Sequence, residues 1–342
     1  MILPAYAKLN LTLDVTGRRP NGYHDIDSVM QTISLHDLIW IERTDCRVFE
    51  VVGPVIAGEN LVLKAARELE GHTGRALPFT IRLFKRIPMG AGLGGGSADA
   101  AAFLKAANIL YELKLAPGEL LEIASAVGQD LPFLLSGGTA RATGLGSTLS
   151  PLPSVPSSWR FLVVCPPLEI STRAVYEAVA DGATSGRRTP KLVEALEAPT
   201  LTLPQRGRES SEDLPQRGSN PPPRPSPARG EGENPARGEG ENPARGEGED
   251  PARGQGENPA RGEGDFAGLF GNDLEVASRR LFPALDEAMD RLHRAVPGLT
   301  MSGTGAALFA AFAGREDAEA ALTAMGELGY PAWVCRPVSG AA

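Results

Sequence analysis

The segment PMGAGLGGGSADAAA, residues 88–102, carries five glycines within the seven residues from Gly90 to Gly96. It follows FTIRLFKRI, residues 79–87, whose pattern is typical of a strand, and leads into residues 97–114, whose alanine-rich pattern is typical of a helix. Glycine permits positive φ and close backbone approach, and a helix start presents unpaired N–H groups and a positive dipole end. A tight turn packing a helix on a sheet needs only one or two glycines, so the segment indicates a polyphosphate-binding loop.

The loop fits neither of the two common nucleotide-binding motifs. It contains a formal GxGxxG at Gly90, Gly92 and Gly95, with Glu112 about twenty residues further on. A dinucleotide fingerprint places that acidic residue after a second strand, whereas here the predicted helix runs almost to Glu112. A Walker A loop requires a Gly-Lys pair, and the chain has none.

The regions around the loop alternate between strand and helix patterns. Strand patterns are predicted at residues 7–17, 24–43, 79–87, 159–167, 306–313 and 331–337, and strand and loop structure at 131–146. Helix patterns are predicted at residues 60–70 with Asn60 as N-cap, and at 97–114, 117–128, 171–181, 272–295 and 315–329. This mixed order favours an α+β fold or mixed α/β layers.

Composition restricts the class of protein. The 342 residues suffice for roughly two domains, and 42% hydrophobic and 22% charged residues fit a soluble globular chain. A net charge of -8 provides no global attraction to nucleic acid or anionic lipid. The three cysteines are an odd, widely spaced set without metal-ligand spacing, which favours reduced thiols over a disulfide framework or a zinc site. With no leader pattern and no long apolar run, we expect a cytoplasmic protein that binds no membrane.

Glycine and proline, 40 and 29 residues, are concentrated in one segment. From residue 204 to 264 the hydrophobic residues nearly vanish and PARGEGEN recurs as an eight-residue unit from Pro227 onward. Such a segment buries too little apolar surface to offset the entropy of ordering, which predicts a disordered low-complexity insertion. It could be a partner-docking tract or an RG-rich nucleic-acid tail, but its charge is neutral to acidic and it lacks aromatic residues, which favours a tolerated loop expansion.

Three ordered segments resemble the signatures of the GHMP kinases. They are AYAKLNLTLDV from residue 5, PMGAGLGGGSADAAA from residue 88 and MSGTGAALFAAF from residue 301. Within this superfamily, the blocks RPNGYHDIDSVMQTISLHD, GQDLPFLLSGGTARATGLG and LEISTRAVYEAV resemble the family that phosphorylates 4-diphosphocytidyl-2-C-methyl-D-erythritol. The resemblance covers the chain apart from the repeat insertion.

The resemblance implies a two-domain GHMP kinase fold of the α+β class. An ATP-binding domain similar to ribosomal protein S5 domain 2 would span residues 1–152, and an α/β-plait-like domain would span residues 153–342, interrupted by residues 204–264. The implied activity is ATP-dependent phosphorylation of the tertiary 2-hydroxyl of the cytidylated methylerythritol, in the non-mevalonate route to isopentenyl diphosphate. We expect a small-molecule substrate, no nucleic-acid partner, and a monomer or weak homodimer.

The resemblance also assigns the residues of the reaction. Asp130 would accept or orient the proton of the substrate hydroxyl, and Lys8 would neutralise charge on the transferred phosphoryl group. Asn10 would hydrogen-bond the substrate hydroxyls. From the residues alone, Asp130 could instead be a helix C-terminal cap or a loop acid, and the strand face that carries Lys8 and Asn10 could simply be solvated.

The same resemblance also identifies the residues expected to bind the cytidylated acceptor and ATP. His24 would recognise the cytosine edge, Tyr23 and Tyr176 would stack on its two faces, and Thr172 would contact the methylerythritol end. Alone, His24 would be read as a surface residue and Tyr176 as a core aromatic. The residues expected to bind ATP are Asn60, Leu61, Lys85, Pro88, Met89, Gly90, Ala91, Gly92, Leu93, Gly94, Gly95, Gly96 and Ser97.

Magnesium is expected with ATP, and the sequence offers Ser97 as a candidate ligand but no second acidic one. Two alternatives stay open at this stage. One is a different GHMP kinase acting on homoserine, mevalonate or a sugar, which leaves the GYHDIDS and ISTRAVY blocks unexplained. The other is a non-catalytic interaction protein that works through the repeat tract.

Overall fold

The computed structural model describes residues 1–54, 58–179, 188–198 and 268–340. These residues belong to one compact unit. The insertion predicted at residues 204–264 lies outside the described residues. In the described part, no helix has the length and apolar character needed to cross a bilayer.

The first sheet is built around a long antiparallel hairpin, and its strand order is β3-β4-β2-β1-β8, with β5 on β2 and β6 on β5. Its strands are β1 (Ile2–Arg18), β2 (His24–Arg43), β3 (Val48–Val52), β4 (Phe79–Phe84), β5 (Thr139–Gly144), β6 (Thr148–Pro151) and β8 (Gly271–Asn272). The β1–β2 register shifts between Tyr6 and Lys8 and again between Asn10 and Thr12. Such irregularities redirect side chains locally, and here they flank the residues expected to act in the reaction.

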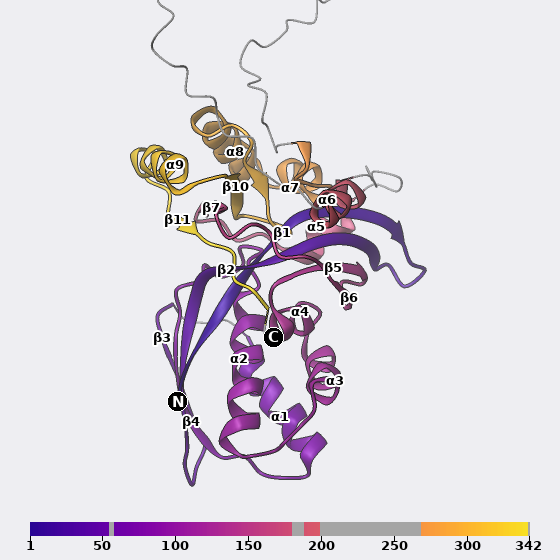
Figure 1. The fold of residues 1–342 in the computed structure, drawn as a ribbon, viewed down its shortest axis with the longest axis vertical. Coiled ribbons are helices and arrows are strands. Elements are labelled where there is room, and N and C mark those ends of the chain that lie inside the picture. The colour runs from indigo at the N-terminus through magenta and orange to yellow at the C-terminus, as the bar shows by residue number, and fades with distance from the viewer. Residues whose placement is uncertain (55–57, 180–187, 199–267, 341–342) are drawn as a thin grey trace, which may run out of the picture. The chain divides into compact units, whose positions relative to one another are not determined.

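Helices cover one face of this sheet (Figure 1). They are α1 (Leu61–Thr73), α2 (Gly95–Leu110), α3 (Pro117–Val127) and α4 (Leu131–Ser136). The alanine-rich α2 packs closely because small side chains let it approach the strands, and Phe103 meets Phe79 of β4 edge to face at 5.2 Å. The β4–α2 connection is the glycine loop, which is therefore supported by the core on both sides.

A second sheet has the order β11-β7-β10-β9. It consists of β7 (Arg160–Val164), β9 (Thr300–Met301), β10 (Leu308–Phe312) and β11 (Ala332–Cys335), and the accompanying helices are α5 (Thr172–Glu177), α6 (Arg188–Glu197), α7 (Leu274–Leu281), α8 (Pro283–Ala295) and α9 (Arg315–Glu327). Alternation along β7 sends Phe161 and Val163 into the core shared with the first sheet, whereas Leu162 and Val164 join the core beneath the helices.

Several later segments of the chain return to the hairpin of β1 and β2. β8 pairs with β1 in parallel, with Thr12 opposite Gly271. The C-terminal segment lies along β2, where the N–H of Ser34 donates to Arg336 O and the N–H of Val338 donates to Thr32 O, each at 2.9 Å. The polar face of β1 is therefore enclosed.

The domain boundary predicted between residues 152 and 153 falls in the connection between β6 and β7. The division into two domains at this point stays a prediction.

The α+β class is confirmed, but three predicted elements need correction. Residues 131–136 form the helix α4 instead of a strand, because a short buried apolar run looks the same in either state. The helix predicted at 272–295 breaks at Phe282, since Pro283 disfavours helical geometry in the residue before it. The helix predicted at 97–114 ends at Leu110, and Glu112 and Lys114 take positive φ.

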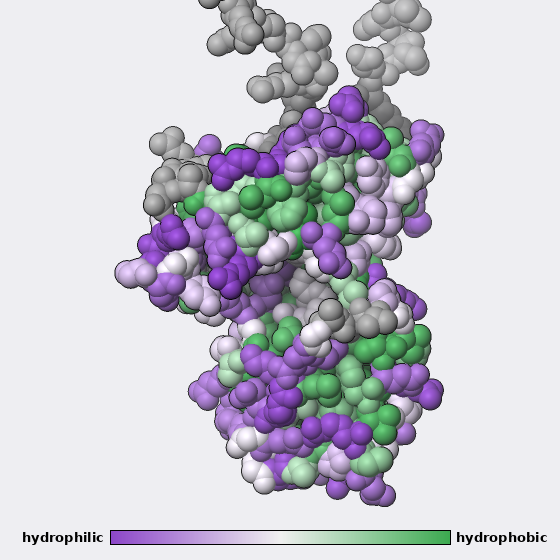
Figure 2. Space-filling model, turned by 180° about the vertical axis from the view of Figure 1, so that it is seen from behind, coloured by the Kyte–Doolittle hydropathy of each residue, from purple (hydrophilic) through white to green (hydrophobic). Residues whose placement is uncertain are grey.

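The cysteines and the exposed apolar side chains are two further features of the fold. The three cysteines are free thiols, as predicted, with Cys165 and Cys335 buried. Val48 and Val52 of the edge strand β3 and Phe84 of the neighbouring strand β4 are exposed apolar side chains. Figure 2 shows hydrophobic patches, in green, among hydrophilic surface, in purple, on the face opposite that of Figure 1.

Candidate active site

The glycine loop takes a backbone conformation that other residues rarely adopt. Gly90, Gly92 and Gly94 have φ of 64°, 74° and 70°. A Cβ on Gly92 would lie 2.2 Å from the carbonyl oxygen of Ser302, and one on Gly94 would lie 3.1 Å from Cγ of Lys8. Backbone geometry therefore favours glycine at all three positions, and at Gly92 and Gly94 neighbouring atoms also leave no room for a side chain.

The loop is bound to the turn after β9. The hydroxyl of Ser302 donates to Gly92 O at 3.3 Å, and the N–H of Ala307 donates to Ala91 O at 3.2 Å. From the other side, the N–H of Lys8 donates to Leu93 O at 3.0 Å. The first and third motifs of the sequence therefore meet at the second.

The start of α2 is available to bind an anion. Gly94 is its N-cap in the left-handed conformation, and no side chain caps the helix. The N–H groups of the first turn of this 16-residue helix have no partners within the helix, and the positive end of its dipole faces the loop. This arrangement is a general phosphate-binding geometry.

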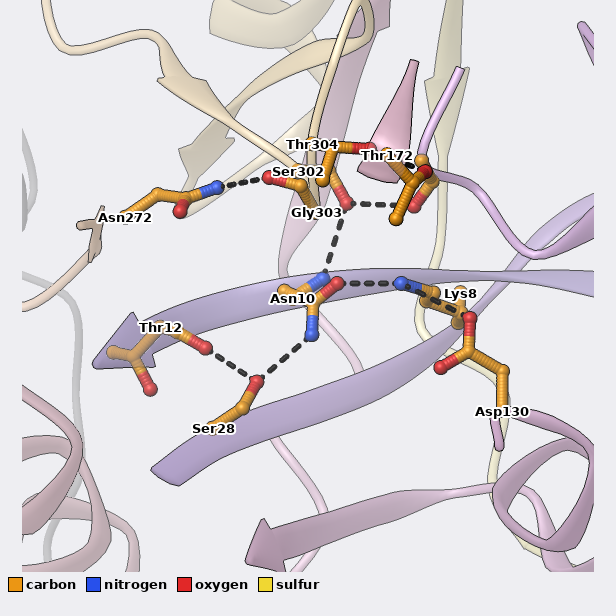
Figure 3. Close-up of polar contacts among 11 residues, drawn as sticks. Lys8, Asn10, Thr12, Ser28, Asp130, Thr172, Asn272, Ser302, Gly303 and Thr304 are labelled. Carbon is orange, nitrogen blue, oxygen red and sulfur yellow. Dashed lines mark hydrogen bonds and ion pairs between the residues drawn. The ribbon is translucent and has the colours of Figure 1, made fainter. Parts of the chain in front are cut away.

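Lys8 and Asp130 meet beside the loop (Figure 3). The Nζ of Lys8 lies 3.6 Å from Oδ2 of Asp130 and donates to Oδ1 of Asn10 at 2.5 Å. The Lys8 side chain is 5% exposed and that of Asp130 is 34% exposed. Asp130 stands at the N-cap of α4, yet its carboxylate makes no capping hydrogen bond, so it is open to a molecule from solution.

The polar face of β1 is buried, which excludes the simpler reading of a solvated strand face. Lys8, Asn10 and Thr12 are 4%, 2% and 0% exposed. The N–H of Asn10 donates to Oγ of Ser302 at 3.1 Å, and its Nδ2 donates to Oγ of Ser28 at 2.8 Å (Figure 3). Ser28 in turn donates to Thr12 O at 2.5 Å. These bonds leave the Asn10 side chain with a single orientation.

A second group of residues lies next to this pair. The rings of His24 and Tyr176 are 5.7 Å apart between centroids, with an angle of 33° between their planes. Burial and the negative charge of Asp130 both raise the pKa of Tyr176, so its phenol stays neutral and lies within electrostatic reach of Asp130. His24 is buried, whereas Tyr23 is 57% exposed at the tip of the hairpin. Thr172, the first residue of α5, shares a 3.0 Å hydrogen bond with Thr304 (Figure 3).

Two family models match parts of this chain. The GHMP kinases N terminal domain matches residues 60–138, and the GHMP kinases C terminal domain matches residues 253–331. The chain is 41% identical over 219 residues to the 4-diphosphocytidyl-2-C-methyl-D-erythritol kinase of Carboxydothermus hydrogenoformans, covering 63% of this chain and 72% of that protein. The chain belongs to this kinase family.

Solved structures agree with the same assignment. A crystal structure of 4-(cytidine 5'-diphospho)-2C-methyl-D-erythritol kinase matches with a TM-score of 0.68 and 29% identity, over 100% of both chains. A homoserine kinase from Cytophaga hutchinsonii matches with a TM-score of 0.54 and 15% identity, over 98% of this chain and 95% of that one, which shows the shared fold alone.

The residues expected to hold adenine lie at the start of α1. Asn60 is its N-cap, with Oδ1 accepting the N–H of Val62 at 2.9 Å. It also lines a pocket of about 380 Å³ together with Phe49, Val51, Gly53, Pro54, Gly58, Glu59 and Leu63. The side chain of Leu61 comes within 3.6 Å of where a Cβ on Gly96 would lie, which puts it against the loop. Pro88, Met89 and Ser97 lie within the loop or at the start of α2.

The expectation that Lys85 contacts ATP is not supported by its placement. Its side chain is 3% exposed, and its Nζ lies 2.5 Å from Asp37 Oδ2 and 2.8 Å from Asp99 Oδ2. The ammonium is thus enclosed beneath the loop and already paired. The reason lies in Asp37 and Asp99, two carboxylates that sequence reasoning did not assign to the site.

Other residues of the site were also not assigned from sequence. Ser28, Ser302, Thr304 and Asn272 hold Asn10, the loop and the turn at 302–304, and Nδ2 of Asn272 donates to Gly303 O at 2.6 Å. The third motif, MSGTG, was the available signal for Ser302 and Thr304, since a glycine turn in such a motif brings its small polar residues to the loop. Ser28 lies in the GYHDIDS block, two residues after Ile26. The only clue in the sequence was that a strand places these two side chains on the same face.

The described residues bring no three His, Cys, Asp or Glu side chains together as a metal site. Ser97 is partly exposed at the start of α2, and its Oγ lies 3.9 Å from where a Cβ on Gly128 would lie, near Asp130 in sequence. A hydroxyl at this position fits a magnesium ion that is held mainly by phosphates and water.

Proposed function

We propose that the chain transfers the γ-phosphoryl group of ATP to the tertiary 2-hydroxyl of 4-diphosphocytidyl-2-C-methyl-D-erythritol. The observation that carries this proposal is the meeting of three features at one place. Lys8 hydrogen-bonds the glycine loop and pairs with Asp130, and Asp130 is within electrostatic reach of Tyr176, whose ring lies beside that of His24. A phosphoryl donor and a cytidylated acceptor would therefore both reach Asp130.

The step balances with the groups present. The hydroxyl oxygen attacks the γ-phosphorus, the bond from this phosphorus to the bridging oxygen of ADP breaks, and the hydroxyl proton passes to Asp130. The Lys8 ammonium stabilises the charge on the phosphoryl oxygens, and Asn10, held by Ser28 and Ser302, orients the acceptor. The start of α2 binds the phosphates of ATP. Magnesium, with Ser97 as a protein ligand, would neutralise phosphate charge when bound.

Base selection would come from the second group of residues. His24 would hydrogen-bond the cytosine edge while Tyr23 and Tyr176 stack on the ring, and Thr172 would contact the methylerythritol end. The pocket lined by Asn60 would hold the adenine, with Leu61 beside the loop. In this proposal ATP and the acceptor would contact different residues of the site.

The test is phosphorylation by the purified full-length protein with ATP and magnesium. The cytidylated methylerythritol is compared with mevalonate and homoserine as acceptors, and the product is identified by ³¹P NMR. Turnover of the cytidylated acceptor alone, competitively inhibited by CDP, supports the proposal. Turnover of another acceptor with no effect of CDP would assign the chain to a different GHMP kinase activity.

The remaining expectations concern the state of the protein in the cell. We propose a cytoplasmic monomer or weak homodimer that binds no nucleic acid. Light scattering tests the oligomeric state, and a nucleic-acid retardation assay tests the absence of nucleic-acid binding.

Deleting residues 204–264 distinguishes an enzyme from an interaction protein. A kinase with a tolerated loop keeps its turnover after the deletion, whereas a protein that works through the repeats loses its partner.

A further inference from the structure

Beneath the glycine loop, three charged side chains from three different elements form a buried group. Asp37 comes from β2, Lys85 follows β4, and Asp99 lies in the second turn of α2. Their side chains are 0%, 3% and 1% exposed. Lys85 Nζ lies 2.5 Å from Asp37 Oδ2 and 2.8 Å from Asp99 Oδ2, so one ammonium joins two carboxylates.

Asp37 also holds the backbone that enters the loop. Its Oδ1 accepts the N–H of Arg86 at 2.5 Å and the N–H of Ile87 at 2.8 Å. These two residues directly precede Pro88, where the loop begins. A single carboxylate thus binds Lys85 through one oxygen and the entry of the loop through the other.

Lys85 contacts the exit of the loop in two ways. Its Nζ pairs with Asp99, and it also approaches the backbone, since a Cβ on Gly95 would lie 3.3 Å from Nζ. The same Cβ would lie 3.0 Å from Cγ2 of Ile87. The lack of a side chain at Gly95 therefore lets the residues before the loop lie directly against the first turn after it.

The composition of the group argues against a purely stabilising role. Burial raises the pKa of Asp99 to about 8, which Lys85 opposes and Asp37 reinforces. Oδ1 of Asp99 has no hydrogen-bond partner among the described residues. Buried charges of this kind often stabilise a fold no better than apolar residues of similar size, so a geometric role is the stronger reading.

We propose that Asp37, Lys85 and Asp99 are positioning residues that hold the entry and exit of the glycine loop at the spacing a polyphosphate requires, while Lys85 itself does not touch ATP. This inference rests on the proposed function, because it takes the loop to bind the phosphates of ATP. It gives the buried lysine a role through the loop backbone instead of through the nucleotide.

The test compares ATP with inorganic tripolyphosphate, which lacks the nucleoside. Binding of each is measured by calorimetry to the full-length protein and to the double variant Lys85→Met/Asp99→Leu, in which Asp37 keeps its two backbone hydrogen bonds to Arg86 and Ile87. We expect both ligands to bind about tenfold more weakly, in the same proportion, with the KM for ATP rising and the KM for the acceptor unchanged. A thermal melt confirms folding, and the single variant Asp99→Leu, which leaves Lys85 paired with Asp37, serves if the double variant does not fold.

The matched control is Arg82→Met/Glu50→Leu. This pair joins β4 to β3 at 3.0 Å on an exposed face of the same sheet, and its loss should change neither affinity. A loss confined to ATP would mean that Lys85 contacts the nucleoside, and unchanged affinity for both ligands would mean that the loop needs no such support; either result overturns the inference. A wild-type protein that binds both ligands but phosphorylates no acceptor would contradict the proposed function. The binding comparison between wild type and variant could still be made in that case.

Discussion

Lys8 Nζ lies 3.6 Å from Asp130 Oδ2, but the two side chains differ in exposure, 5% against 34%. The ammonium is enclosed and held by Asn10, whereas the carboxylate faces outward. A buried cation beside an accessible carboxylate suits the proposed phosphoryl transfer, in which the cation would stay fixed while the carboxylate would meet the incoming hydroxyl. In the proposed reaction Lys8 would therefore stabilise charge, and Asp130 would take up the proton.

Asp130→Asn should lower kcat by about 10²–10⁴ and leave the Kd for ATP nearly unchanged, because the amide cannot accept the hydroxyl proton. Steady-state kinetics with calorimetric titration of ATP checks both quantities. Asp45→Asn, at an exposed turn, is the control and should change neither. A kcat for Asp130→Asn within a factor of two of the wild type would remove Asp130 from the reaction.

Gly92→Ala should weaken ATP binding and cost about 2–3 kcal/mol of stability. Gly92 has a φ of +74°, and its new Cβ would lie 2.2 Å from Ser302 O. Gly118→Ala in α3 is the matched control, since nothing lies within 4 Å of its Cβ and alanine favours the helix. Denaturant titration and ATP binding report the two effects, and equal stability of the two variants would contradict the geometry.

The pH dependence of stability should carry a contribution from Asp99. Burial raises its folded pKa to about 8 from 3.8, so the folded state holds a proton that the unfolded state releases. This stabilisation is complete below about pH 4 and is lost as the pH rises through about 8. The free energy of unfolding should therefore fall with rising pH over that range.

Asp99→Asn should flatten this fall, because the amide carries no titrating proton. Urea titrations at about pH 5, 7 and 9 on the wild type, on Asp99→Asn and on the exposed control Asp45→Asn measure the slopes. If wild type and Asp99→Asn lose stability equally over this range, the carboxyl of Asp99 does not titrate as inferred.

The sequence predicted the glycine loop well because its information is local. Dense glycine between a strand and a helix pattern indicates positive φ, and Gly90, Gly92 and Gly94 have it. Lys8 and Asp130, by contrast, are far apart in the chain, and periodicity alone favoured a solvated face for Lys8. Only the family resemblance brought the pair together before the structure did.

Other features depend on contacts that no local pattern reports. Alternation places Lys85 on a strand end but does not say that Asp37 of β2 and Asp99 of α2 both contact it. The helix α6, for which no prediction was made, is ten residues long, and its helicity depends on packing against β1 and β2. The site could be assigned by resemblance, whereas its supporting residues required the fold.

Thr189→Val should destabilise the protein by about 1–3 kcal/mol. Thr189 of α6 is fully buried, its Oγ1 donates to Asp27 O at 2.9 Å, and it lies 2.7 Å from Oγ1 of Thr12. Valine keeps the shape but removes both of these buried hydrogen bonds. Thr323→Val is the control, because this hydroxyl is exposed on α9 and bonds within its own helix. Thermal melts that shift equally for both variants would contradict the role of Thr189.

Tyr176→Ala should raise the KM for the cytidylated acceptor about tenfold or more, because one stacking face for the base is lost, while the KM for ATP stays near the wild-type value. Tyr176→Phe is the matched control and should act like the wild type, since the ring remains and burial already keeps the phenol neutral by raising its pKa.

His24→Ala should also weaken acceptor binding, because its ring lies 5.7 Å from that of Tyr176. Inhibition by CDP, measured on each variant, separates the base from the rest of the acceptor. If CDP inhibits Tyr176→Ala and His24→Ala as strongly as the wild type, these two rings do not form the cytosine site.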